Sequence, residues 1–287
     1  MNKIEIKKEN LIVCGRSDAL FKSVVGCEKG KHILKAILEE ILKIKIDNLE
    51  IINCELEKLS LGEKGKRVDC LVKTKDSLIN VEVNTSDSQV IRDRNLRYLL
   101  TKHINQFRES ENYNKINKSI QINLDWEANY EETKKKYMLF EENNSKDLLS
   151  EYIVIYKINM DKLEELCYTC DRDNFEFKYS SMLTIRDKEK LLKYCKGDRV
   201  MEEYAKETIE LNNNDIYKDI FTKEKDEEII RKSEIMYATD KGIEAGIETG
   251  IEQSKIEIAK NMIAKNMEIS LISELTGLSI EEIEKKR

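Results

Sequence analysis

The stretch 66-KRVDCLVKTKDSLINVEVNTSD-87 decides how this chain folds. Apolar and polar residues alternate on both sides of a polar segment, 74-TKDS-77, which predicts two strands joined by a turn. Two carboxylates, Asp69 and Glu82, interrupt the apolar runs of these strands. An amide, Asn84, follows Glu82 by two positions and therefore points to the same face of its strand.

The predicted strands, 67–73 and 78–84, can pair in one register. A tight turn in the middle of the polar segment brings Asp69 directly opposite Glu82. Facing carboxylates repel each other unless a cation, a proton or bases intervene. A hard divalent cation such as Mg²⁺ relieves this repulsion, because it binds one or two carboxylates together with water and phosphate oxygens.

The pattern also allows a second interpretation of the hairpin. It could present a solvated face, on which Lys73 or Lys75 neutralises the acids. The next segment, residues 88–110, has the spacing of a helix and should cover one face of the sheet. The spacing does not tell whether that face is the acidic one.

The remaining patterns predict an α/β core with a mixed sheet. Helical spacing runs through residues 18–43, where Asp18 is the expected N-cap. Further strands are expected at 49–57, 118–124, 134–140 and 151–158. The order of helix, hairpin, helix and strands suits a mixed sheet flanked by helices. We expect this core to occupy residues 1–160, followed by a mostly helical, highly charged extension at 161–240 and a helical tail at 241–287.

The tail begins with 242-GIEAGIETGIE-252, a repeat with a period of four residues. Each glycine costs a helix about 1 kcal/mol relative to alanine. The segment could be a helix packed closely against another helix, because such a contact would offset the cost. It could instead be a flexible linker, in which no helix has to form.

The end of the tail predicts two short helices around Gly277. This glycine is the expected left-handed C-cap of the first, and Ser279 and Glu282 form a capping box at the start of the second. The pattern fits a helix-turn-helix that reads DNA. However, the last helix carries acids where a groove-reading helix needs basic or amide side chains, which favours packing or dimerisation.

The composition limits the function. The 287 residues include 50 Lys and Arg and 56 Asp and Glu, for a net charge of −6. This balance excludes a protein that simply coats DNA, but it leaves room for a nuclease with a local basic groove. The start of the sequence lacks the apolar core of a signal peptide, and no apolar run is long enough to span a membrane. We therefore expect a cytoplasmic protein with reduced thiols and no membrane partner.

Three segments together resemble the PD-(D/E)XK nuclease superfamily. Within it they resemble the recombination-promoting nuclease (Rpn) group, often labelled PD-(D/E)XK family transposases. The segment 18-DALFKSVVG-26 is similar to the opening Asp-x-x-Phe-Lys-x-x-x-Gly of the family, and the hairpin to its strand Asp followed by Glu-x-Gln. The segment 92-RDRNLRYLLTKHINQF-107 is similar to its Arg-x-x-x-Tyr stretch, and 275-LTGLSIEEI-283 to its C-terminal end. The likeness covers most of the chain and implies a restriction-endonuclease-like core with a helical C-terminal region.

The resemblance implies a DNA endonuclease that uses Mg²⁺ or Mn²⁺. Asp69 and Glu82 would hold the metal with the backbone carbonyl of Val83, and Asp18 would lie near the site as an accessory acid. In the superfamily the residue two after the Glu is Lys, and in this group commonly Gln, which would orient the attacking water. Here it is Asn84, which is shorter than Gln and cannot carry the charge of Lys. A nearby cation such as Lys73 would have to compensate.

The resemblance also implies which residues contact DNA, and these are Arg92, Arg94, Arg97, Lys22 and Lys73. Two other functions remain open. One is a nuclease-fold protein that has lost turnover and binds DNA or a protein partner. The other is a helical interaction protein that works through residues 200–287. We further expect pairing into a homodimer through the C-terminal helical region, which suits duplex cleavage.

Overall fold

The fold is given by a computed structural model, in which residues 6–52, 55–56, 66–67, 69–106 and 116–285 are described. The chain divides into two compact units, Met1–Thr222 and Lys223–Arg287. The strands are β1 (Glu50–Ile52), β2 (Glu55–Leu56), β3 (Lys66–Arg67), β4 (Cys70–Lys73), β5 (Ser77–Asn84), β6 (Lys118–Asp125), β7 (Lys134–Glu141) and β8 (Asn144–Asn159). The helices of the first unit are η1 (Lys8–Asn10), α1 (Asp18–Val24), α2 (Lys31–Leu42), α3 (Gln89–Ile104), α4 (Met160–Thr169), η3 (Arg172–Asn174), α5 (Lys178–Met182), α6 (Lys188–Cys195), α7 (Arg199–Asn213) and the start of α8 (Asp215–Ala264).

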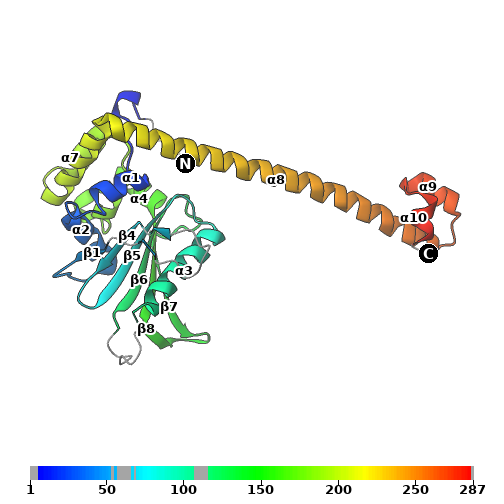
Figure 1. The fold of residues 1–287 in the computed structure, drawn as a ribbon, viewed down its shortest axis with the longest axis horizontal. Helices are drawn as coiled ribbons and strands as arrows, with labels where there is room; N and C mark the ends of the chain where they lie inside the picture. Colours follow the sequence, from blue (N-terminus) through cyan, green and yellow to red (C-terminus); the bar gives the residue numbers. More distant parts are fainter. Residues whose placement is uncertain (1–5, 53–54, 57–65, 68, 107–115, 286–287) are drawn as a thin grey trace. The chain divides into compact units, whose positions relative to one another are not determined.

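A mixed six-stranded sheet forms the centre of the first unit, in the order β1-β4-β5-β6-β8-β7 (Figure 1). Strands β5, β6 and β8 run parallel, β4 and β7 pair antiparallel with β5 and β8, and the edge strand β1 pairs antiparallel with β4. The predicted hairpin is β4 and β5, in which Cys70 pairs with Val81 and Lys73 with Leu78. This is the predicted register, and the expected α/β core with a mixed sheet is confirmed.

One face of the sheet is apolar and carries the hydrophobic core. Every second residue of the central strands points to this face, including Ile79 and Val81 of β5 and Ile122 of β6. Helices α1 and α2 cover it, and Figure 1 shows α3 on the other side of the sheet. Helices α4 to α7 contribute to the same core through Leu163, Met182, Leu191, Met201 and Tyr204. The packing of the core therefore continues past residue 160, where we expected the core to end.

The opposite face of the sheet is polar and nevertheless buried. Its buried side chains alternate with the apolar ones and are Asn80, Glu82, Asn84, Ser119, Gln121, Asn123, Asp125, Lys157 and Asn159. Helix α3 contacts β5 and β6 on this side, where Asn95 donates to Asn84 and Asn123. The spacing in the sequence did not tell which face of the sheet this helix covers. In the structure α3 lies over the face that carries Glu82.

Several local expectations need correction. Ser17, not Asp18, caps α1, since its side chain accepts a bond from the N–H of Leu20 at 3.2 Å. A helix was expected over 88–110, and α3 ends at Ile104. Residues 107–110 of the expected range lie outside the described part of the chain. The strand expected at 49–57 is divided between β1 and β2, and the last strand, β8, begins seven residues earlier than expected, because its hairpin partner β7 extends it. Among the described residues, no helix combines the length and apolarity needed to cross a membrane.

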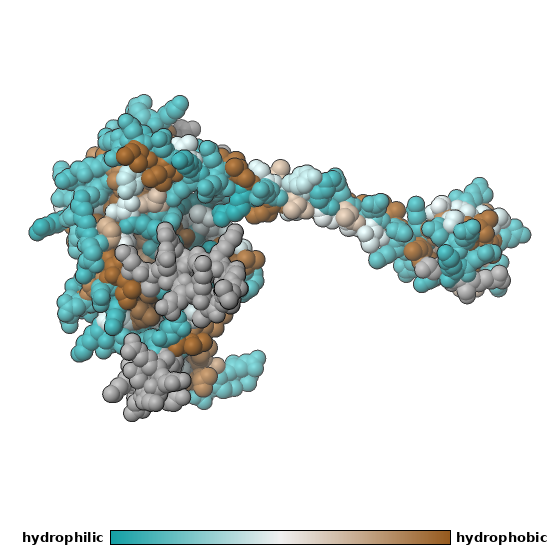
Figure 2. Space-filling model, in the orientation of Figure 1, coloured by the Kyte–Doolittle hydropathy of each residue, from teal (hydrophilic) through white to brown (hydrophobic). Residues whose placement is uncertain are grey.

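The second unit consists of most of α8, α9 (Ile269–Thr276) and α10 (Ile280–Glu284). Residues 242–252 lie inside the continuous helix α8, so they form no flexible linker. Apolar side chains emerge among hydrophilic ones along this helix (Figure 2). Gly277 ends α9 in the left-handed conformation, and Ser279 and Glu282 form the predicted capping box of α10. The last two helices pack through Ile272 and Ile283 against Ala259 of α8.

Candidate active site

The site is built on the hairpin of β4 and β5. Asp69 immediately precedes β4, and Glu82 is the sixth residue of β5, one position past the Cys70–Val81 pair. The N–H of Val83 donates to Oδ2 of Asp69 at 2.8 Å, which fixes this carboxylate against the end of β5. The Glu82 residue is 3% exposed and accepts a bond from Nδ2 of Asn80 at 3.1 Å. The two acids therefore lie together, Glu82 buried and Asp69 with 15% of its side chain exposed, and the interpretation of a solvated hairpin face is wrong.

Both carboxyl groups hold their protons more tightly than usual. Burial, followed by the negative charge of Asp18, raises the pKa of Asp69 from 3.8 to about 6. Burial, followed by the charge of Asp69, raises the pKa of Glu82 from 4.5 to about 8. Full ionisation of the pair at neutral pH therefore requires a positive partner, which is the condition that a divalent cation satisfies.

Two cations flank the acids from opposite helices. Nζ of Lys22 in α1 lies 2.7 Å from Oδ2 of Asp18 and 3.3 Å from Oδ1 of Asp69. The guanidinium of Arg94 in α3 lies 3.8 Å from Oε2 of Glu82. Lys73 is at the turn end of β4, about 13 Å from Asp69 along the strand. The cation expected to compensate for Asn84 is therefore not Lys73.

Asn84 is held at both ends of its amide. Its Nδ2 donates to Oδ1 of Asp125 at 2.8 Å, and its Oδ1 accepts bonds from Arg94 at 3.0 Å and Asn95 at 3.2 Å. Because a carboxylate only accepts and a guanidinium only donates, these partners determine the orientation of the amide. Asn84 therefore holds Arg94 beside Glu82, and one of its two amide N–H donors is used by Asp125.

Beyond Asn84 lies a buried ion cluster that the sequence reasoning missed. Lys157 donates to Oδ1 of Asp87 at 2.5 Å and lies 3.5 Å from Oδ2 of Asp125. Arg92 forms a bidentate pair with Asp87, at 2.8 and 2.9 Å. Burial acts to raise the pKa of Asp87, but the bonds from Arg92 and Lys157 hold it below the usual value. Arg92 thus belongs to this cluster, while Arg97 is exposed on α3.

The sequence of β6 contains a pattern that could have indicated the buried polar face and Asp125 within it. Its sequence, 118-KSIQINLD-125, alternates polar and β-branched or apolar residues just as β5 does. The parallel register aligns Asn80 with Gln121 and Asn84 with Asp125. Two adjacent strands with the same polar alternation indicate a shared polar face.

The donors at the hairpin fit a hard divalent cation. Oxygen ligands from one or two carboxylates, completed by water, are what Mg²⁺ prefers. The carbonyl of Val83 points to the same side of β5 as its N–H, which bonds Asp69, because both groups of a strand residue point the same way. Over the described ranges, no three His, Cys, Asp or Glu side chains converge into a ready-made cage.

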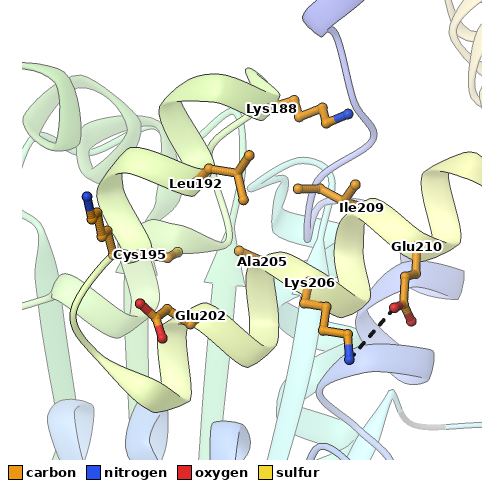
Figure 3. A pocket seen from close by; sticks show the side chains of 9 residues that line it. Lys188, Leu192, Cys195, Glu202, Ala205, Lys206, Ile209 and Glu210 are labelled. Carbon is orange, nitrogen blue, oxygen red and sulfur yellow. Dashed lines mark ion pairs between the residues drawn. The ribbon is translucent and has the colours of Figure 1, made fainter.

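A hollow of the first unit lies elsewhere. It has a volume of about 460 Å³ and lies between α6 and α7, with Leu192, Ala205 and Ile209 on its walls (Figure 3). Lys206 and Glu210 form an ion pair of 3.9 Å at its rim. None of the predicted site residues lines this hollow, so it is not the candidate active site.

A mixed sheet in which an Asp just before one strand of a hairpin lies beside a buried Glu of the next strand is the arrangement of the PD-(D/E)XK nuclease fold. The family model described as PD-(D/E)XK nuclease family transposase matches residues 15–238, and the chain belongs to this family. A second model, described as the C-terminal HTH domain of the Rpn/YhgA-like nuclease family, matches residues 252–287. No curated protein and no solved structure gives a significant match.

The second match changes the interpretation of the tail. The acidic side chains of α10 favoured a packing or dimerisation segment over a helix-turn-helix. The matched segment contains the end of α8 together with α9 and α10, so the tail is similar to the C-terminal HTH domain of that family. The match favours the helix-turn-helix interpretation of the tail, and packing or dimerisation through the acidic helix stays a prediction.

Proposed function

We propose that the protein is a metal-dependent DNA endonuclease that hydrolyses phosphodiester bonds. The observation that carries this proposal is the pair of Asp69 and Glu82, which are largely shielded from solvent and have raised pKa values, and which lie between Lys22 and Arg94. In the proposal these carboxylates and the carbonyl of Val83 hold Mg²⁺ or Mn²⁺. A bound Mg²⁺ would polarise the scissile phosphate and lower the pKa of a coordinated water.

In this proposal Arg94 supplies the positive charge that Lys provides in the superfamily and that Asn84 lacks. Its guanidinium bonds Oδ1 of Asn84 and lies near Glu82, so it can stabilise negative charge that develops on the phosphate. Asn84 acts by holding Arg94 in that place. Lys22 orients Asp69 and Asp18 and offers a second positive charge to DNA, with Asp18 as an accessory acid.

DNA is the proposed partner. Arg97 on α3 and Lys73 at the hairpin turn are exposed cations on either side of the site, and the helix-turn-helix domain is a second contact with the duplex. Because the whole chain has a net charge of −6, binding must come from these local surfaces. We assign the protein to the cytoplasm, where free thiols such as those of Cys14 and Cys195 stay reduced.

A second function is favoured by the state of Asn84. Both ends of its amide are bonded within the protein, and the position that carries Lys in the superfamily holds a neutral group that cannot supply a positive charge. A protein of this kind could bind DNA, or a protein partner, without cutting it.

Nicking of supercoiled plasmid in Mg²⁺ or Mn²⁺ separates the two functions. The endonuclease proposal expects the wild type to nick the plasmid, and Asp69→Ala and Glu82→Ala to be inactive while still binding DNA. Equal nicking by all three proteins would contradict the assignment of the acids. DNA binding by a wild type that never nicks, with either metal, would establish the second function instead.

A further inference from the structure

Helix α8 carries a line of exposed apolar side chains within the second unit. We call it the isoleucine seam, and its members are Ile229, Met236, Ile243, Ile247, Ile251 and Ile258. Each of these residues exposes half or more of its surface. The apolar core of the unit begins only at Ala259, so among the described residues of this unit the seam is not part of any core.

The spacing of the seam is that of a helix-packing surface. Its members follow one another at seven residues, or at four and four, so at about 100° per residue they stay within an arc of about 80°. Apolar residues at sevenfold spacing form the contact line of paired helices. Scattered surface isoleucines would not keep to one line over four heptads.

The flank of the seam is shaped for close approach. Gly246 and Gly250 lie beside Ile247 and Ile251, and a Cβ added at either glycine would meet no atom within 4 Å. Glycine weakens an isolated helix, so these positions gain nothing for α8 alone. Small residues beside large apolar ones let two helix backbones approach closely, which is a second and independent sign of a partner helix.

The chemistry of the seam identifies the partner. Glu244, Glu248 and Glu252 run beside it, and these acids disfavour both nucleic acid and an anionic membrane surface. The seam itself needs an apolar helix of equal length. Its spacing is nearly the same when read from either end, so a second copy of α8 can match it in an isologous, two-fold contact.

We infer that the protein forms a homodimer in which the isoleucine seams of two copies of α8 pack against each other. The inference does not depend on nuclease activity, since it uses only the exposed side chains of the second unit. Pairing would present two helix-turn-helix domains and two candidate active sites in one assembly.

Light scattering of the full chain, over a range of concentrations, tests the inference. The wild type should show twice the chain mass of 33.7 kDa, with dissociation on dilution. The double variant Ile243→Asp, Ile251→Asp places charges in the seam and should weaken the dimer by about 100-fold or more. Circular dichroism should show an unchanged fold at high concentration, because both side chains are exposed in the single chain.

Ile235→Asp is the matched control. Ile235 is an equally exposed isoleucine of α8 but lies about a third of a turn away from the seam, so this variant should stay dimeric. A wild type that is monomeric at every concentration would overturn the inference. So would a double variant that remains dimeric, or a control that dissociates as readily as the double variant. A double variant that loses its helical signal would also overturn it, because the seam would then be part of the fold of one chain.

Discussion

Replacement of Glu82 by glutamine should stabilise the metal-free protein at alkaline pH. The pKa of Glu82 is raised from 4.5 to about 8, mainly by burial. Because the folded-state pKa is the higher one, the stability that the neutral carboxyl provides is fully present below the unfolded-state pKa. It is lost as the pH rises through the folded-state value. Glutamine stays neutral throughout, so the variant keeps this stability.

The magnitude follows from the pKa. Each unit corresponds to about 1.4 kcal/mol, so the free energy of unfolding of the variant should gain on the wild type by on the order of 4 kcal/mol between about pH 5 and pH 8. For a unit of this size that is a difference in melting temperature of about 10 °C. The assay is thermal or denaturant unfolding of both proteins in EDTA across this pH range.

Of the wild type and Glu82→Gln, only the wild type should be stabilised against unfolding by Mg²⁺. A ligand that binds only the folded protein stabilises it by about 2.7 kcal/mol at a hundredfold excess over its dissociation constant. Glu40→Gln is the matched control, since Glu40 is a half-buried acid whose pKa is also raised by burial, to about 7, but it accepts hydrogen bonds from the start of α5. Glu40→Gln should keep the response to Mg²⁺. Parallel pH profiles for the wild type and Glu82→Gln, or an equal response of both to Mg²⁺, would refute the reasoning.

Three further variants test other parts of the account. Arg94→Ala should lower the rate of plasmid nicking by about 100-fold, the typical effect of removing one group that stabilises developing charge. Arg94→Lys should recover part of the lost rate, and full activity in Arg94→Ala would show that Arg94 is not part of the site. Gly30→Ala should cost about 3 kcal/mol of unfolding free energy in denaturant titrations, because the added Cβ would lie less than 2.5 Å from the carbonyl oxygen of Val24, and an unchanged midpoint would contradict the packing of α1 against α2. Ser279→Ala should destabilise the helix-turn-helix domain by about 1 kcal/mol, since the capping box of α10 is lost; this should appear as faster hydrogen exchange in α10 and not in α1.

The hairpin could be predicted from the sequence because its signals are local. Alternation of side chains and a single polar turn determine which residues face each other, and Asp69 and Glu82 followed from that register. The caps of the last two helices were predictable for the same reason, since a glycine and a serine act on their own turn. The acids of α10 favoured packing or dimerisation, whereas the family model matched over residues 252–287 favours a helix-turn-helix.

The burial of the site could not be predicted, because it depends on contacts between distant segments. Helix α3 faces the sheet with Asn95, a residue that gives no apolar periodicity from which the buried face could be inferred. The polar strand β6 is about forty residues from Glu82 in the chain and adjacent to it in the sheet. Arg94 could not be recognised as the cation that contacts Asn84 without knowing that α3 crosses the polar face.

The location of a bound divalent ion tests the central claim most directly. A crystal structure of the full chain soaked with Ca²⁺ or Mn²⁺ should show the ion between the carboxylates of Asp69 and Glu82, with the carbonyl of Val83 as a further ligand. Nζ of Lys22 should then have moved from its 3.3 Å contact with Asp69. An ion bound elsewhere, with Lys22 and Arg94 still paired to the two acids, would contradict the account.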